Sequence, residues 1–324
     1  MNLLVFGTGM IVNDFLNGAD EMPFDNIYLC GRNKEKVDGL VDKFKLAGGY
    51  DNVEEALSSE TEVAYVGLPN NLHFEYAKMS LEAGKHVIVE KPFMSNLKEA
   101  KEIWEIAKTY NKMIFEASLA FYFPAYKSLE KDLNTLGDIH VVECNFSQYS
   151  SRYDRFLNGD IAPVFNIENC GGALMDLNVY NLNLMVGLFG MPKSIKYDAT
   201  IINSIDVAGI ALLDYGDLKA SCIASKSTHA PRHICIQGEK ASVHLPSSMS
   251  RAYNYEIKYN DGRLEEKNFE DEHHRMYHEF DEFLRCISEE DFDNCERYIN
   301  RCFACLELLD ACRKDAGIVF NSDL

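Results

Sequence analysis

Residues 3–12 read LLVFGTGMIV, a short apolar run followed by two glycines that are one residue apart. The run 3–6 predicts a buried strand, and residues 10–16 predict a helix directly after it. Gly7 then allows a tight turn, and Gly9 lets the main chain approach a diphosphate whose charge meets the helix N-terminus. This pattern favours a dinucleotide-binding segment over an ordinary strand-to-helix turn. Its candidate contacts are Gly7, Thr8, Gly9, Met10 and Ile11.

The end of the second expected strand, residues 27–30, bears on which dinucleotide would bind. Enzymes that use NAD often carry an acidic residue there to bind the ribose, whereas this chain has Gly31-Arg32-Asn33. Arg32 could pair with a 2′-phosphate, which favours NADP(H) over NAD(H) and makes Gly31 and Arg32 candidate cofactor contacts. The alternative is a solvated arginine at a helix start, with Asn33 as the cap. Val12 stands where the turn usually has Gly or Ala, which indicates a slightly wider contact between helix and strand.

The chain is long and acidic. Its 324 residues fit two domains better than one core. A formal net charge of −19 repels phosphate backbones and anionic membranes, so neither nucleic acid nor a membrane is an expected partner. The chain opens on a strand-like run rather than on a secretion signal, and its ten scattered cysteines fit reduced thiols. We therefore expect a cytoplasmic protein.

Strand-like and helical segments alternate over the first 120 residues. Asn70 or Asn71 is expected to cap a helix that Gly84 ends, and Asn96 with Glu99 resembles a capping box for the next helix. Alternation of this kind predicts a doubly wound parallel sheet over residues 1–120. The expected strands after the first are 27–30, 63–68, 86–89 and 113–117.

The pattern changes after residue 120. Strand-like segments joined by short turns fill residues 194–259, which predicts a mostly antiparallel sheet. Residues 121–324 are therefore expected to form a second, α+β domain. Its expected helices are 125–133, 173–189, 271–287 and 295–316.

Several motifs spread along the chain occur together. They are Pro69-Asn70-x-x-His73, Ala83-Gly84-Lys85-His86-Val87, Glu90-Lys91-Pro92, Gly171-Gly172-Ala173-Leu174-x-Asp176-x-x-x-Tyr180, Leu188-Phe189-Gly190-x-Pro192, His278-Glu279-Phe280 and Ala316-Gly317-Ile318-x-Phe320. In this set the chain resembles the glucose-fructose oxidoreductase, inositol dehydrogenase and rhizopine-catabolism (Gfo/Idh/MocA) family. Within that family it looks most like the NADP-linked dihydrodiol and aldose dehydrogenases. Tyr180, where many relatives have histidine, points the same way.

The resemblance implies a dinucleotide-binding Rossmann domain over residues 1–120. It implies that residues 121–324 form a domain with a large, open-faced and mostly antiparallel sheet, which binds the substrate and mediates oligomerisation. It implies an NAD(P)-dependent oxidoreductase that transfers a hydride between nicotinamide and the hydroxyl or carbonyl carbon of a sugar, cyclitol or diol. Open sheets of this family commonly pair between subunits, so a homo-oligomer, a dimer or tetramer, is expected by analogy. The further cofactor contacts that the resemblance implies are Leu68, Pro69, Asn70, His73, Glu90 and Lys91.

The candidate catalytic residues are Lys91, Asp176 and Tyr180. Hydride transfer to or from an alcohol also moves a proton on the substrate oxygen, which a positioned acid–base group can handle. Asp176 and Tyr180 are four residues apart on an expected helix, so they share one face. The resemblance implies that Lys91 lies near the nicotinamide and the substrate hydroxyl. Tyr180 is then the candidate acid–base group, Lys91 its partner or proton relay, and Asp176 the group that orients the substrate or Lys91.

Each of these three residues also has an ordinary interpretation. Lys91 could be a solvated strand-end lysine, Asp176 a helix-surface acid and Tyr180 a core aromatic residue. Their joint occurrence at the family spacing favours the catalytic interpretation. Two other functions stay open: a cofactor-sensing regulator of the same fold without net chemistry, and redox-assisted cleavage of a glycoside.

One segment departs from the family pattern. Relatives often carry an arginine in an R-x-x-P-like pattern after the sixth strand, whereas residues 120–124 here read AFYFP. An aromatic residue in place of that charge indicates a less polar substrate pocket. The pair His274 and His278 and the motif Cys302-x-x-Cys305 lack further ligands at a recognisable spacing, so no metal site is expected.

Overall fold

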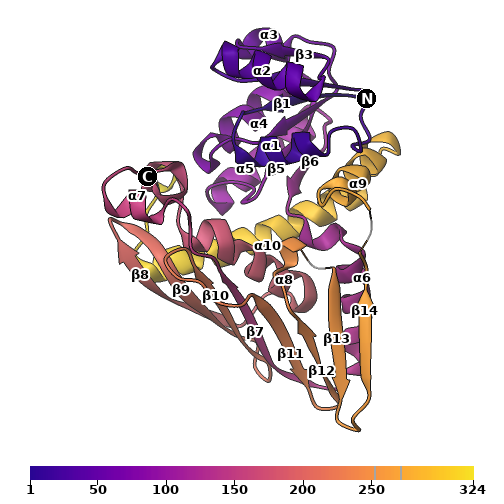
Figure 1. Ribbon diagram of the computed structural model, residues 1–324, viewed down its shortest axis with the longest axis vertical. Coiled ribbons are helices and arrows are strands. Elements are labelled where there is room, and N and C mark those ends of the chain that lie inside the picture. Colours follow the sequence, from indigo (N-terminus) through magenta and orange to yellow (C-terminus); the bar gives the residue numbers. More distant parts are fainter. Residues whose placement is uncertain (252, 271) are drawn as a thin grey trace. The chain divides into compact units, whose positions relative to one another are not determined.

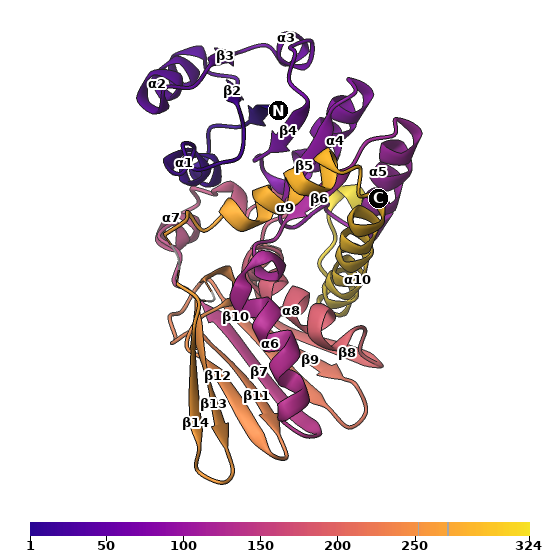
Figure 2. The ribbon, with the colours of Figure 1, turned by 90° about the vertical axis from the view of Figure 1, so that its right-hand side faces the viewer.

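The computed structural model describes residues 1–251, 253–270 and 272–324, and this part of the chain forms two compact units. The first unit comprises Met1–Ala117 and His273–Phe303, and the second comprises Ser118–Glu272 and Ala304–Leu324. Helix α10 (Phe292–Ala316) therefore contributes residues to both units. Figure 1 and Figure 2 show the elements of each unit in two views.

The first unit is built on a six-stranded sheet in which every strand is parallel to its neighbours. Its order, β3-β2-β1-β4-β5-β6, is that of the Rossmann fold and confirms the expected doubly wound sheet. Strand β3 was not predicted, because Gly-Gly-Tyr contains no apolar run. The strands are β1 (Asn2–Phe6), β2 (Asn26–Cys30), β3 (Gly48–Tyr50), β4 (Val63–Val66), β5 (His86–Glu90) and β6 (Ile114–Ala117).

Asparagine side chains begin several helices of the first unit. Asn33, Asn52 and Asn96 each accept a main-chain N–H from three residues further on, and so cap α2, α3 and α5. At α5, the Glu99 carboxylate also accepts the N–H of Ser95, the residue before the cap. The helices of this unit are α1 (Met10–Asn17), α2 (Lys34–Phe44), α3 (Val53–Leu57), α4 (His73–Glu82), α5 (Leu97–Thr109) and α9 (Tyr277–Ser288).

The start of α4 differs from the prediction. The expected cap at Asn70 or Asn71 is wrong, because these residues lie inside a short 3-10 turn, η1 (Asn70–Leu72), that precedes the helix. Helix α4 begins at His73 without a side-chain cap. The expected start of the α9 segment at Asp271 lies outside the described residues.

The second unit is built on an eight-stranded sheet of order β14-β13-β12-β11-β7-β10-β9-β8. Its pairs are antiparallel except for β7 with β10, so the expected mostly antiparallel sheet is confirmed. The edge strand β14 was not predicted, because Leu-Glu-Glu-Lys-Asn is almost entirely polar. The strands are β7 (Ile139–Ser147), β8 (Ser194–Ile202), β9 (Ile205–Asp214), β10 (Lys219–Ser225), β11 (His233–Gly238), β12 (Ala241–Leu245), β13 (Asn254–Tyr259) and β14 (Leu264–Asn268).

One face of this large sheet is covered and the other is open. Along β9, Ala211 and Leu213 are buried, whereas the alternating Ile210 and Leu212 are 42% and 53% exposed. Helix α8 (Val179–Phe189) lies on the covered face against β7 and β10. The expected open-faced sheet is therefore confirmed.

Two buried amides join the start of α8 to the middle of the sheet. The Asn178 side chain donates to the Cys222 carbonyl at 3.0 Å, and the Asn181 side chain donates to the Ile223 carbonyl at 3.1 Å. Both acceptors lie on β10, one of the central strands. The remaining regular helices of the second unit are α6 (Pro124–Asp132) and α7 (Tyr153–Leu157).

The aromatic residues after β6 belong to the core of the second unit. Phe121, Tyr122, Phe123 and Tyr126 are each at most 6% exposed. A Cβ on Gly187 of α8 would lie 2.5 Å from both the Phe121 ring and the Tyr126 hydroxyl, so these two rings pack tightly on the helix. Burial of this kind leaves no flat surface for stacking nucleic-acid bases.

The ten cysteines are free thiols, and all except Cys235 are buried. Among the described residues, no group of three or more His, Cys, Asp or Glu side chains is arranged to hold a metal ion. Within that part of the chain, no helix combines the length and apolar character that crossing a bilayer requires.

The cap of α5 gives a test of the first unit's stability. Replacing Asn96 by Ala removes the acceptor for the Glu99 N–H, so the free energy of unfolding should fall by about 1 kcal/mol. Urea unfolding measures the change. Asn96→Ser, which keeps a capping oxygen, should retain most of the stability, and equal losses in both variants would contradict the capping role.

Candidate active site

The turn after β1 has the shape that a phosphate-binding turn needs. Gly7 has φ +115°, and a Cβ there would lie 2.6 Å from the Gly67 carbonyl oxygen. Gly9 precedes α1, and a Cβ on Gly9 would meet no atom within 4 Å. The space before the helix N-terminus is therefore open, and a diphosphate fits there against the first N–H groups of α1.

Neighbouring glycines complete this edge of the sheet. A Cβ on Gly31, after β2, would lie 2.8 Å from the Thr8 methyl group. A Cβ on Gly67, after β4, would lie 2.5 Å from a methyl group of Val12, which is fully buried. Val12 therefore occupies the space that Gly67 leaves, so the small residue at this contact follows β4 instead of lying on the helix.

Arg32 lies exposed directly after Gly31. Asn33 caps α2, as the ordinary interpretation of this segment expects, and its side chain accepts the Lys36 N–H at 2.9 Å. Arg32 and Thr8 follow the carboxyl ends of the neighbouring parallel strands β2 and β1, at the same edge of the sheet. This position fits the role of an arginine that meets a ribose phosphate.

His73 joins two segments of the same edge. Its Nε2 lies 2.9 Å from the Leu68 carbonyl oxygen and its Nδ1 lies 3.0 Å from the Pro92 carbonyl oxygen. The ring is fully buried, and burial lowers the pKa of His73, against the opposing effect of the two carbonyl oxygens. His73 thus connects the segment after β4 with the segment after β5, the two places where Asn70 and Lys91 are found.

Glu90, the last residue of β5, points into the protein. Its carboxylate accepts a hydrogen bond from the Tyr65 hydroxyl at 2.6 Å, and Glu90 is 6% exposed. Burial raises the pKa of Glu90, while the bond from Tyr65 and the charge of Lys91 act in the opposite direction. Lys91 follows at the carboxyl end of β5 with intermediate exposure, and its peptide bond to Pro92 is cis.

A second buried carboxylate, Glu116 of β6, was missed by the sequence interpretation. Glu116 accepts the Phe93 N–H at 2.9 Å and lies 3.5 Å from the Cys302 thiol. Burial raises the pKa of Glu116 to about 7, against the bonds from Phe93 and Cys302. A charged residue inside the apolar run 113–117 is the signal that could have revealed it. Its bond to Phe93 fixes the chain two residues after Lys91.

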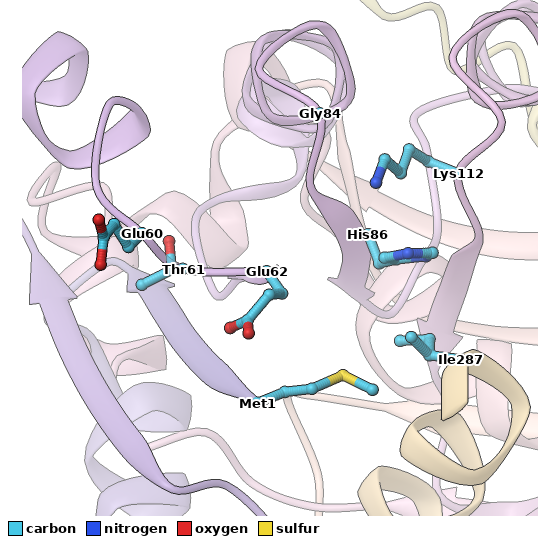
Figure 3. Close-up of a pocket in the computed structure, with 8 residues that line it drawn as sticks. All are labelled: Met1, Glu60, Thr61, Glu62, Gly84, His86, Lys112 and Ile287. Carbon is cyan, nitrogen blue, oxygen red and sulfur yellow. The ribbon is translucent and has the colours of Figure 1, made fainter.

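The hollow in Figure 3 lies elsewhere on the first unit. It measures about 480 Å³ and is lined by Met1, Glu60, Thr61, Glu62, Gly84, His86, Lys112 and Ile287. Except for Ile287, which lies on α9, these residues stand at or just before the amino ends of the strands, whereas Gly7 and Lys91 follow the carboxyl ends. Because ligands of open parallel sheets bind outside the carboxyl ends, this hollow is separate from the expected cofactor site.

In the second unit, Gly171 and Gly172 allow a close approach at the start of a helix. Gly172 has φ +117°, and a Cβ there would lie 2.0 Å from Oδ1 of Asp206. Asp206 is 1% exposed, and its Oδ2 accepts the Leu174 N–H at 2.6 Å and the Tyr197 hydroxyl at 2.8 Å. Burial raises the pKa of Asp206 to about 7 despite these two bonds.

The expected helix 173–189 forms, but its first part is a π-helical turn, η6 (Leu174–Asn178), before α8. Such turns are rare and often occur at functional sites. Asp176 lies in this turn and Tyr180 lies at the start of α8. The Asp176 side chain is 30% exposed and is paired with Lys226, a residue that the sequence interpretation did not single out. The Tyr180 ring is 9% exposed and lies 5.6 Å from the Phe146 ring.

The candidate residues therefore fall into two groups. The first unit brings the segments of Gly7, Arg32, Asn70 and Lys91 to one sheet edge, with His73 and Glu90 buried behind it. The second unit brings Asp176 and Tyr180 together at the start of one helix. The joint action of Lys91 with those two residues stays a prediction.

Comparison with known proteins identifies the family. Residues 1–118 match the "Oxidoreductase family, NAD-binding Rossmann fold" (GFO_IDH_MocA), and residues 132–244 match the GFO/IDH/MocA C-terminal domain. The chain is 33% identical to scyllo-inositol 2-dehydrogenase (NADP(+)) IolU of Bacillus subtilis, over 98% of both chains. It is 27% identical to trans-1,2-dihydrobenzene-1,2-diol dehydrogenase of Mus musculus, over 74% of this chain and 73% of that one.

Solved structures agree on the fold. A levoglucosan dehydrogenase in complex with NADH and levoglucosan has a TM-score of 0.84 at 16% identity, covering 98% of this chain and 97% of the other. KijD10, a 3-ketoreductase from Actinomadura kijaniata in complex with NADP and TDP-benzene, has a TM-score of 0.84 at 17% identity, covering 97% of both chains. The chain belongs to the Gfo/Idh/MocA family of NAD(P)-dependent oxidoreductases.

Proposed function

We propose that this protein is a dehydrogenase that oxidises a ring hydroxyl of an inositol-like polyol, or reduces the corresponding ketone, with NADP(H) as its cofactor. The observation that carries the proposal is the placement of Lys91 at the same carboxyl sheet edge as the open turn at Gly9. A polyol substrate is supported by the 33% identity with the scyllo-inositol dehydrogenase over almost the whole chain.

We propose that residues 1–120 hold the cofactor and residues 121–324 bind the substrate. Gly7, Thr8, Gly9, Met10 and Ile11 would bind the diphosphate through main-chain groups, and Arg32 would meet the 2′-phosphate. Leu68, Pro69 and Asn70 would line the nicotinamide side, with His73 and Glu90 fixing these segments from behind. When bound, the nicotinamide accepts or supplies the hydride.

The proton would be handled by residues of this chain. Tyr180 would take the proton of the substrate hydroxyl during oxidation and return one during reduction. The ammonium group of Lys91 would favour the ionised phenol or relay its proton. Asp176 would accept a hydrogen bond from a second hydroxyl and so orient the ring.

The open face of the large sheet supports a homo-oligomer. Ile210 and Leu212 on β9 and Val141 on β7 are apolar and exposed, on strands that flank β10. We propose that this face pairs with another copy in a dimer or tetramer, and that the protein acts in the cytoplasm.

Arg32 gives a test of cofactor choice. Arg32→Ala should raise the dissociation constant of NADP+ about 10-fold or more, because a charge-assisted contact with the 2′-phosphate is lost. The dissociation constant of NAD+, which lacks that phosphate, should change little. Fluorescence titration measures both constants. Lys43→Ala, on an exposed lysine in the last turn of α2, is the matched control and should change neither. Equal losses of both cofactors in Arg32→Ala would contradict the assignment.

Lys91 and Tyr180 give the test of catalysis. Lys91→Ala and Tyr180→Phe should each lower kcat for scyllo-inositol oxidation by about 10²-fold or more, because each removes a group from the proton transfer. NADP+ should still bind, and nicotinamide absorbance follows turnover. Tyr259→Phe, at the end of β13, is the matched control and should keep full activity.

Unchanged turnover in both catalytic variants would reject the roles given to these residues. A wild-type protein that binds NADP+ tightly and turns over no polyol, sugar or diol would instead fit a cofactor-sensing protein.

A further inference from the structure

Lys226 is a buried lysine that the proposed chemistry does not yet use. It directly follows β10, and the residue is 4% exposed. Lysines are almost never this buried unless a partner satisfies the charge. Here the partner is Asp176, because Nζ of Lys226 makes a hydrogen-bonded ion pair with Oδ2 of Asp176.

The position of Lys226 is fixed from several directions. Its N–H donates to the Val207 carbonyl at 2.8 Å, and its carbonyl accepts the Ser150 N–H at 2.9 Å. Its Nζ also lies 5.3 Å from the centre of the Phe165 ring. Three segments of the second unit therefore determine where the ammonium group stands.

The main chain that carries Asp176 is fixed separately. Asp206 accepts the Leu174 N–H at the start of the π-helical turn, and Gly172 leaves room for the Asp206 carboxylate. The charge of Lys226 also lowers the pKa of Asp206, against the larger effect of burial. Asp206 thus holds the backbone of the turn, and Lys226 holds the side chain of Asp176.

We propose that Lys226 is a positioning residue, which holds the Asp176 carboxylate in one orientation so that its exposed part accepts a hydrogen bond from a substrate hydroxyl. The proposal rests on the dehydrogenase function proposed above. The buried ammonium group of Lys226 is hydrogen-bonded to Oδ2 of Asp176 and so limits the directions in which the carboxylate can turn. Asp176 then acts as a fixed acceptor, and the proton transfer is left to Tyr180.

The kinetic test compares Lys226→Met with Lys226→Arg in the full-length protein. Lys226→Met removes the charge but keeps the length of the side chain, so the KM for scyllo-inositol should rise about 10-fold or more while the dissociation constant of NADP+ stays unchanged. Lys226→Arg keeps a cation and should restore most of the KM. A purely structural defect would lower the concentration of active enzyme, and hence the apparent kcat, at an unchanged KM.

Lys219→Met is the matched control. Lys219 begins β10, the strand that Lys226 follows, and pairs with Asp214 at 2.7 Å, but both side chains are exposed. Exposed ion pairs contribute little interaction energy. The kcat, the KM for scyllo-inositol and the dissociation constant of NADP+ should therefore all stay at wild-type values. An unchanged KM in Lys226→Met, or the same change in Lys219→Met, would overturn the proposal.

Asp176→Asn shows whether Lys226 acts through Asp176. If it does, adding Lys226→Met to Asp176→Asn should change the KM less than twofold, because the carboxylate that Lys226 holds is already gone. A full repetition of the Lys226→Met effect in the Asp176→Asn background would overturn the proposal.

A measurement without substrate separates this proposal from the proposed function. If the wild-type protein oxidises no polyol, the function fails, and thermal unfolding then decides on the pair. Asp176→Asn should lower the melting temperature in the wild-type background but not in the Lys226→Met background, where the carboxylate has lost its cation. Equal shifts in the two backgrounds would overturn the role of Lys226.

Discussion

The close approach of Gly7 to Gly67 is the constraint on which the cofactor half of this protein depends. The main chain after β1 passes so near the carbonyl after β4 that a Cβ would not fit between them. Gly31 leaves the room that Thr8 occupies, and Gly67 leaves the room that Val12 occupies. The ends of three neighbouring strands are thereby held together, and the N-terminus of α1 faces open space. A phosphate-binding turn requires both features.

The substrate half uses buried charges for a similar purpose. Asp206 beneath Gly172 fixes the start of the π-helical turn, and Lys226 fixes the carboxylate of Asp176 within that turn. In the first unit, Glu116 accepts the Phe93 N–H and so fixes the chain two residues after Lys91. In each unit the residues proposed to meet the substrate or cofactor are thus backed by buried polar groups, which hold their orientation.

The fold could be predicted in most respects because its strands and helices carry clear apolar patterns. Strands β3 and β14 could not, since Gly-Gly-Tyr and Leu-Glu-Glu-Lys-Asn owe their conformation to pairing with a neighbouring strand. The predicted cap of α4 was wrong because Asn70 and Asn71 lie in a 3-10 turn that precedes the helix. In the site, the turn and the motif residues were accessible from the sequence. Lys226 was not, because Ser-Lys-Ser at a strand end gives no sign of the tertiary contact with Asp176.

The transfer of the hydride itself can be followed with labelled substrate. The wild-type protein, NADP+ and scyllo-inositol deuterated at its ring carbons are incubated together, and the reduced cofactor is examined by mass spectrometry. A dehydrogenase of the proposed kind gives NADPH that carries one deuterium from the ring. Tight binding of NADP+ with no deuterium in the cofactor, for scyllo-inositol and for a panel of labelled sugars and diols, would contradict the assignment of this chain as a polyol dehydrogenase.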